Sequence, residues 1–250
     1  MTQELFRENS YLAQCTATIA EISPQGVMLD QTVFYPLGGG QGGDAGVLLL
    51  SDGVALAIAD TRRGKDAAGL PNGQIVHVPA PGQEALLATL SVGCTVSARI
   101  DWERRHRMMR FHSTTHLLCH LVPQLVNGCS ITPDYARLDF NMTDPLDKEQ
   151  LTEGIDRLVS AALAVTVGAI SEEELDANPG LVKSMSVQPP RGLGQVRTIR
   201  VGNEELIDYQ PCGGTHVANT REIGAVMVTK IEKKSATTRR VVLGFAPQAV

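Results

Sequence analysis

Hydrophobic and polar positions follow a short-strand pattern through the first hundred residues. Apolar residues alternate with polar ones in brief runs, separated by clusters of Gly, Pro and Asp. The clearest turn is Ser23-Pro24-Gln25-Gly26. Several short strands at this spacing predict a small β-barrel or sandwich. The expected strands cover residues 15–22, 26–30, 54–60, 74–78 and 95–101.

A helical pattern begins after Ile100. The chain from Trp102 to Val122 contains neither Gly nor Pro, and its apolar residues recur at helical spacing. This stretch predicts one long helix. A second helix is expected from Asp147, a candidate N-cap with Gln150 three residues on, to about Val167.

A third, short helix is predicted by the capping box of Ser171 and Glu174, and it should end before Pro179. Strands are expected at residues 135–141, 195–201, 224–234 and 238–245, the last two as a hairpin. The predicted fold class is therefore α+β. We expect a small β-barrel domain over residues 1–100, with a glycine-rich loop, and an α+β domain with an antiparallel sheet over residues 101–250.

Composition narrows the class of protein. Hydrophobic residues make up 43% of the chain, and no stretch approaches the roughly 18 apolar residues that a membrane helix needs. The N-terminus has no apolar segment typical of a secretory signal. Five scattered cysteines favour a reducing compartment. We therefore expect a cytoplasmic protein without a membrane partner.

Charge is unevenly distributed along the chain. The net charge is −5, which argues against indiscriminate nucleic-acid binding, and no DNA partner is expected. The acidic excess lies in the N-terminal part. Basic residues gather at 104–110 and 230–240, where they could contact a phosphate backbone. A solvated helix face and a charged hairpin explain the same residues equally well.

Two short motifs carry candidate metal ligands. His112 and His116 lie one helical turn apart on one face, a spacing at which two imidazoles can bind one ion. His120 continues that face as a third candidate. Cys212 and His216 flank two glycines that permit a tight turn. Together the two motifs supply three imidazoles and one thiolate, a set that favours Zn²⁺ over magnesium or calcium.

These residues carry a resemblance to a known family. "HSTTHLLCHL" and "CGGTHVANTREIGAV" resemble the editing domain of alanyl-tRNA synthetase and its freestanding relatives, the AlaX proteins. "FYPLGGGQGGDAG" at 34–46 resembles the glycine-rich segment that precedes this domain. "ARLDF" at 136–140 and the basic hairpin also match, so the resemblance covers about residues 14–245. We expect no aminoacylation domain, so the resemblance is to a freestanding editing protein.

The resemblance implies an aminoacyl-tRNA deacylase that maintains translation fidelity. Its substrates would be mischarged tRNA(Ala), chiefly seryl-tRNA(Ala), with glycyl-tRNA(Ala) as a second. The family's zinc ligands correspond to His112, His116, Cys212 and His216 here. His120 then becomes a bystander.

Further site residues are expected around these ligands. Gly213 and Gly214 are candidate oxyanion donors through their N–H groups, although a plain tight turn fits them equally. Thr115 is the first candidate for a pocket wall that binds a serine hydroxyl, unless it bonds only to its own helix. Asn127 lies nearest the position where some family members carry Gln or Thr. Gln41 is expected to face the substrate or the tRNA 3′ end, and the expected tRNA contacts are Arg104, Arg105, Arg107, Arg110, Lys233, Lys234, Arg239 and Arg240.

Two alternatives remain open from the sequence. One is a threonyl-type editing deacylase, which also places two histidines on a helix. The other is a non-catalytic, zinc-stapled module that binds tRNA or a synthetase. Four protein ligands are typical of such a closed structural site.

Overall fold

The computed structural model describes residues 2–66, 69, 71–192 and 194–247. The chain separates into two compact units. The first consists of Met1–Gly38 and Gly42–His106, and the second of Gly39–Gln41 and Arg107–Val250. Three residues of the glycine-rich segment therefore pack with the second unit. The expected boundary at residue 100 between two folding domains stays a prediction.

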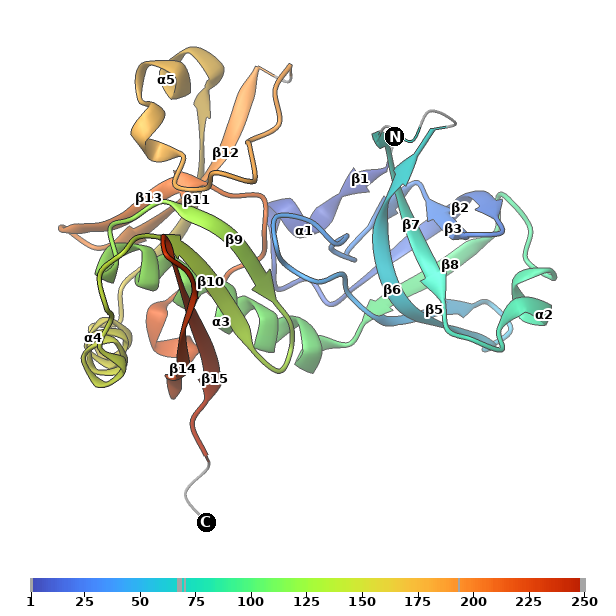
Figure 1. Cartoon of the computed structure of the whole chain (residues 1–250). Coiled ribbons are helices and arrows are strands. Elements are labelled where there is room, and N and C mark those ends of the chain that lie inside the picture. Colours follow the sequence, from blue (N-terminus) through green and yellow to red (C-terminus); the bar gives the residue numbers. More distant parts are fainter. Residues whose placement is uncertain (1, 67–68, 70, 193, 248–250) are drawn as a thin grey trace. The chain divides into compact units, whose positions relative to one another are not determined.

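Six antiparallel strands of the first unit form a closed barrel in the order β2-β3-β7-β6-β5-β8 (Figure 1). Alternate residues point inward, as in β8, where Val96, Ala98 and Ile100 are buried. Gly26 opens β3 with φ 146°, and a side chain there would meet the His77 carbonyl. The strands are β2 (Gln14–Ser23), β3 (Gly26–Leu29), β5 (Gly46–Leu50), β6 (Ala55–Lys65), β7 (Pro71–Pro79) and β8 (Thr95–Ile100).

Short elements complete the first unit. A two-stranded parallel pair joins β1 (Gln3–Glu4) to β4 (Gln31–Thr32). The helices α1 (Leu5–Glu8) and α2 (Glu84–Leu87) are one turn each. The barrel core is aliphatic apart from Phe34 and includes Ile19, Leu29, Leu48, Leu56 and Ile58.

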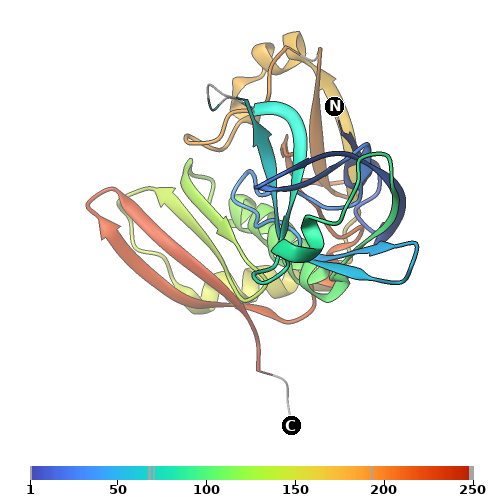
Figure 2. The same cartoon turned by 90° about the vertical axis from the view of Figure 1, so that its right-hand side faces the viewer.

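The second unit is built on two antiparallel sheets. One has four strands in the order β14-β15-β10-β9, and Figures 1 and 2 both show β14 and β15 as a long hairpin beside the other two strands. The other has three strands in the order β11-β12-β13. Their bounds are β9 (Val126–Ile131), β10 (Ala136–Asn141), β11 (Val165–Ser171), β12 (Gln195–Gly202), β13 (Leu206–Pro211), β14 (Val226–Ser235) and β15 (Thr238–Phe245).

Helices cover these sheets. The long helix α3 (Trp102–Leu121) begins where the Asp101 carboxylate accepts the N–H of Arg104. The helix α4 (Lys148–Ser160) packs on β14, and its Gly154 lets Leu121 of α3 approach closely. The remaining helices are α5 (Glu172–Ala177) and the 3₁₀ turns η1 (Pro179–Leu181) and η2 (Thr220–Ile223).

The structure confirms the α+β class with antiparallel sheets and corrects one boundary. The second predicted helix starts as expected, because Asp147 accepts the N–H of Gln150, but it ends at Ser160 and not near Val167. Ala162 adopts a left-handed φ of 51°, and Val165 then begins β11. Strands β5, β9, β11 and β13 were not expected from the pattern. Within the described ranges, no helix is long and apolar enough to cross a membrane.

Candidate metal centre

The first half of the site lies on α3. His112 and His116 are separated by one turn, and both are about 95% buried, with exposed fractions of 5% and 4%. Neighbouring Met108, Met109 and Phe111 are fully buried and hold the helix in place. The apolar packing therefore presents both imidazoles to the interior of the second unit.

The second half is the turn that follows β13. Arg197 of β12 fixes this turn by donating from Nη1 to the carbonyls of Cys212, at 2.6 Å, and Gly214, at 3.0 Å. Gly214 lies against His112, since a Cβ placed there would be 2.1 Å from the Cε1 atom of that ring. Glycine is needed here for close approach, and the Cys212–His216 segment reaches the helix because of it.

The two halves meet in one cluster. The candidate ligand atoms of His112, His116, Cys212 and His216 all lie within 4.8 Å of one another. The Cys212 sulfur is 3.4 Å from His112 Nε2 and 3.3 Å from His216 Nε2. Four ligands around one ion, at metal–nitrogen and metal–sulfur distances of about 2.0–2.3 Å, have similar mutual spacings. These residues could therefore hold one metal ion.

Each of the three histidines of the cluster is held through its Nδ1 atom, the ring nitrogen that does not face the other ligands. His112 donates from Nδ1 to the Gln41 amide oxygen at 2.7 Å, and His116 donates from Nδ1 to Asp208 at 2.6 Å. The Nδ1 atom of His216 lies 3.3 Å from the Ser113 hydroxyl. All three Nε2 atoms are thereby left for an ion, the arrangement by which outer partners orient histidine ligands.

Electrostatics favour a thiolate among imidazoles. Burial raises the pKa of the Cys212 thiol, but the charges of His112 and His216 outweigh it and lower the pKa well below its usual range. Burial lowers the pKa of His216, and the charge of His112 lowers it further. Burial also disfavours charge on His116, yet the hydrogen bond to Asp208 raises its pKa to about 9.

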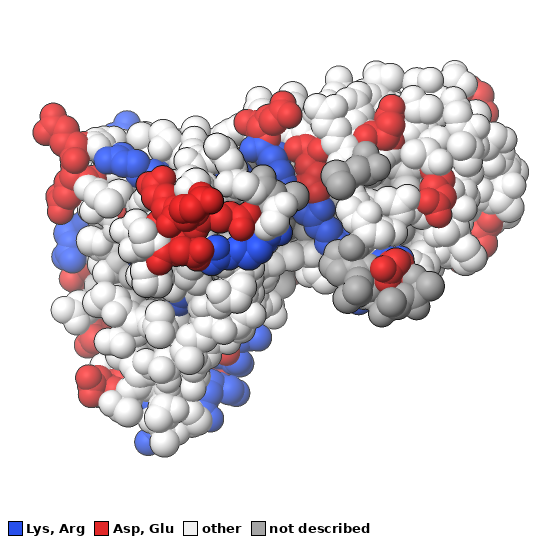
Figure 3. All heavy atoms as spheres, turned by 90° about the horizontal axis from the view of Figure 1, so that it is seen from above, with Lys and Arg blue, Asp and Glu red and all other residues white. Residues whose placement is uncertain are grey.

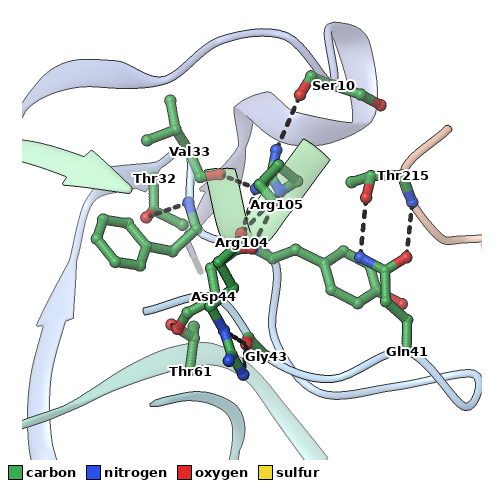
Figure 4. A network of polar contacts seen from close by, with 12 residues as sticks. Ser10, Thr32, Val33, Gln41, Gly43, Asp44, Thr61, Arg104, Arg105 and Thr215 are labelled. Carbon is green, nitrogen blue, oxygen red and sulfur yellow. Dashed lines mark hydrogen bonds and ion pairs between the residues drawn. The ribbon is translucent and has the colours of Figure 1, made fainter. Parts of the chain in front are cut away.

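The structure gives Gln41 polar partners that the sequence did not predict. Its side chain is fully buried, and its amide is engaged inside the second unit. The oxygen accepts from His112. Figure 4 shows the two contacts with Thr215: the oxygen accepts from its N–H at 3.1 Å, and the nitrogen donates to its hydroxyl at 2.8 Å. Gln41 therefore orients a candidate ligand, and its expected contact with the substrate or the tRNA 3′ end stays a prediction.

Other expected pocket residues have defined neighbours. The Thr115 hydroxyl donates to the His112 carbonyl at 2.6 Å, the local bond that the sequence left open. Asn127 donates to the Thr238 hydroxyl at 3.4 Å. Gly213 is exposed in the turn. His120 is exposed, donates to the Ile207 carbonyl and lies outside the four-residue cluster. The substrate contacts of Thr115 and Asn127 stay predictions.

Two of the expected tRNA contacts are wrong. Arg105 is fully buried, forms an ion pair with Asp44 and donates to the carbonyls of Ser10 and Val33 (Figure 4). Arg239 is 8% exposed and donates to backbone carbonyls, including that of Thr143. Neither guanidinium is available to a phosphate, because each is consumed in holding the backbone.

The other basic residues differ in exposure. Lys233 and Lys234 are exposed on β14. Arg240 is paired with Asp139, and the half-buried residues of α3 donate to backbone carbonyls: Arg104 to Gly43, Arg107 to Pro133 and Arg110 to Ile223. On the face shown in Figure 3, neutral atoms dominate, and basic and acidic groups lie next to one another.

Three supporting residues were missed from the sequence: Asp208, Ser113 and Arg197. A signal for the first was present, since strand alternation backwards from Cys212 places Gln210 and Asp208 on its face. Ser113 and Arg197 carried no such signal, because their partners depend on how distant segments meet.

Two family models match this chain. Residues 196–242 match the model described as the threonyl and alanyl tRNA synthetase second additional domain. Residues 5–104 match the model for class II (A) tRNA synthetases. Segments of both units thus match models of aminoacyl-tRNA synthetase domains.

Full-length relatives are more specific. The chain is 31% identical to the alanyl-tRNA editing protein AlaX-M of Saccharolobus solfataricus, over 99% of this chain and 100% of that protein. It is 30% identical to the protein of that name from Methanosarcina barkeri, over 96% and 98% of the two chains. An alanine–tRNA ligase of Pyrobaculum calidifontis is 31% identical, but only 27% of that enzyme is covered. The chain belongs to the AlaX-M family of alanyl-tRNA editing proteins.

Proposed function

We propose that this protein is a zinc-dependent aminoacyl-tRNA deacylase acting in trans on mischarged tRNA(Ala). The observation that carries the proposal is the convergence of His112, His116, Cys212 and His216 on one point. The names of the full-length relatives supply the substrate class. Seryl-tRNA(Ala) is the chief proposed substrate and glycyl-tRNA(Ala) the second.

Zinc is proposed from the chemistry of the donor set. One thiolate and three imidazoles are ligands that zinc prefers, whereas magnesium and calcium take oxygen ligands. When bound, zinc would supply Lewis acidity toward the ester or the attacking water, or an anchor for the substrate. Each histidine ring would be oriented toward the zinc ion by the partner of its Nδ1 atom, which is Gln41, Asp208 or Ser113.

The turn at residues 212–215 offers a donor for the developing oxyanion. Arg197 binds the Cys212 carbonyl, and because a trans peptide is planar, the N–H of Gly213 points the opposite way. The next carbonyl held by Arg197 belongs to Gly214. The N–H of the same peptide group is that of Thr215, and it already donates to Gln41. We propose Gly213 as the oxyanion donor and Gly214, where a Cβ would meet the ring of His112, as a packing residue.

Selectivity for serine is proposed to depend on Thr115. Its proton is donated to the helix, so its oxygen can accept a hydrogen bond from a substrate hydroxyl. An alanyl ester lacks that donor and would leave a polar atom unpaired. Asn127 is proposed as a second polar contact. Lys233, Lys234, Arg104, Arg107, Arg110 and Arg240 are the proposed contacts to the tRNA backbone.

The test compares hydrolysis of seryl-tRNA(Ala) and alanyl-tRNA(Ala) by zinc-loaded and metal-stripped protein. We expect rapid loss of serine only, abolished on stripping and restored by zinc. Cys212→Ser should behave like the stripped protein. His120→Ala, which changes an exposed histidine outside the cluster, should hydrolyse normally.

A folded, zinc-loaded protein that hydrolyses neither ester would overturn the proposal and favour a non-catalytic module. The effect of zinc removal on folding stability further distinguishes a deacylase from a non-catalytic module. A structural zinc should take folding stability with it on removal. For a deacylase, activity should be lost at chelator concentrations that leave the far-ultraviolet circular dichroism unchanged.

A further inference from the structure

A buried carboxylate links one candidate ligand to a lysine. Asp208 on β13 is 2% exposed, and both of its oxygens are occupied. Oδ2 accepts from His116 Nδ1 at 2.6 Å and from Gln210 Nε2 at 2.8 Å. Oδ1 accepts from the ammonium of Lys183. Among the described residues, His116 is thus the one histidine of the cluster whose Nδ1 atom meets a charged side chain.

Backbone contacts fix the position of Lys183. Its carbonyl accepts the N–H of Val126 on β9 at 2.8 Å, and the Val126 carbonyl accepts the N–H of Met185 at 2.9 Å. Ser184 pairs with Val126 in a parallel bridge. The lysine therefore has its backbone tied to β9 while its side chain, 27% exposed, reaches the carboxylate on β13.

The geometry gives the lysine a specific task. A carboxylate bound at one oxygen can rotate about its last side-chain bond, because that torsion is broad. A second bond at Oδ1 fixes the carboxylate plane and with it the direction in which Oδ2 meets His116. The ring of His116, and therefore its Nε2 atom, takes its orientation from that contact.

We propose that Lys183 is a positioning residue of the metal centre, which clamps Asp208 so that His116 directs Nε2 at the bound cation. This inference rests on the metal site of the proposed function. Electrostatic proximity predicts the opposite effect. An ammonium near a cation repels it, so if charge alone mattered, removing Lys183 would tighten metal binding.

The experiment measures cation affinity and not only hydrolysis. The full chain is titrated with Co²⁺ and with Zn²⁺ against a competing chelator, and the visible absorption of bound Co²⁺ reports its coordination geometry. We expect Lys183→Met to weaken binding by about tenfold and to alter the Co²⁺ spectrum. Lys183→Arg, which keeps the clamp, should stay near the unsubstituted protein. Lys148→Met, at the start of α4, removes a lysine of the same unit away from the cluster and should change nothing.

Unchanged or tighter binding in Lys183→Met overturns the inference, as does an equal loss in Lys183→Arg. Lys183→Gln carries the same test if the methionine variant does not fold. In a double variant with Asp208→Asn, Lys183→Met should reduce cation affinity little further, because both substitutions act through the ring of His116. Additive losses of affinity would contradict the proposed role of Lys183. A protein that binds cobalt normally but hydrolyses no ester refutes the proposed function and leaves this inference standing.

Discussion

Gly214 lies directly against the ring of His112. A Cβ added there would meet His112 Cε1 at 2.1 Å and Nδ1 at 2.4 Å. The ring cannot retreat freely, because Gln41 holds its Nδ1 atom. This glycine is required for space and not for backbone conformation, since its φ is not in the left-handed region.

We therefore expect Gly214→Ala to displace His112. Cation affinity should fall by about tenfold or more, and the free energy of unfolding should drop by about 1–3 kcal/mol, the usual cost of overpacking. Isothermal titration with Zn²⁺ and urea denaturation measure the two effects. Gly213→Ala changes the exposed neighbour and serves as the matched control for cation affinity. Equal affinity in both variants would show that the close approach is tolerated.

At the scale of elements, α3 is anchored at its start by a buried ion pair. Arg105 Nε lies 3.1 and 3.0 Å from the two Asp44 oxygens (Figure 4). The same carboxylate accepts the N–H of Tyr35 at 2.6 Å. Both charged side chains are fully buried. The pair thus joins the helix to the strand-connecting segment of the first unit.

Loss of either partner should be costly. We expect Arg105→Met or Asp44→Asn to lower the free energy of unfolding by about 3–5 kcal/mol, because a buried charge is left uncompensated. The double variant should be less destabilised than the sum of the two. Urea denaturation followed by intrinsic fluorescence measures this. Two additive single losses would mean that the ion pair is not coupled.

The β14–β15 hairpin carries the exposed lysines of the proposed tRNA surface. We expect Lys233→Gln with Lys234→Gln to weaken tRNA binding equally for different acylation states. The slope of log affinity against log salt should fall by about 1 for each phosphate that is no longer neutralised. Filter binding at several salt concentrations measures the slope. An unchanged slope would place the RNA elsewhere, and Lys148→Gln is the control lysine on α4.

The sequence predicted those helices and strands that are marked by neighbouring residues, such as helix caps. The capping residues Asp147 and Ser171 mark true helix starts. The end of α4 was missed because the apolar run after Ser160 fits a helix and a strand alike. Pairing of β11 with β12 over seven residues decides the matter, and that pairing is distant in sequence.

The candidate ligands were predictable for the same reason. Each motif sets its own spacing, so His112 with His116 and Cys212 with His216 could be found in sequence. Their supports are distant in sequence: strand alternation places Asp208 on the same face as Cys212, but it does not reveal that the partner is His116, 92 residues away. Arg105 was misassigned because a basic run on a helix gives no sign of which member turns inward.

At the scale of the whole molecule, acid stability should depend in part on a buried histidine of the barrel. His77 lies inside the barrel, where Nε2 contacts the Thr32 hydroxyl at 2.8 Å and Nδ1 the Val27 carbonyl at 3.0 Å. Burial lowers its pKa to about 4. The unfolded chain binds this proton near pH 6.5, so stability is retained above that pH and lost as pH falls toward 4.

Protonation of His77 is expected to lower the free energy of unfolding by about 3 kcal/mol between pH 6.5 and 4. Urea denaturation across this range measures it, and His77→Gln should flatten the dependence. If that variant retains the full pH dependence, other groups cause the acid instability. A shallower curve with unchanged stability at pH 8 would assign the effect to His77.

The membership of Gly39–Gln41 in the second unit has a consequence for how such chains can be recombined. A gene segment that starts at Asp101 encodes every candidate ligand, but it omits the amide that orients His112. Transplanting the editing domain by its apparent start would separate a ligand from its support. A domain exchange that preserves the candidate metal centre therefore has to include Gly39–Gln41. The segment that must be transferred is longer than the one that carries the histidines.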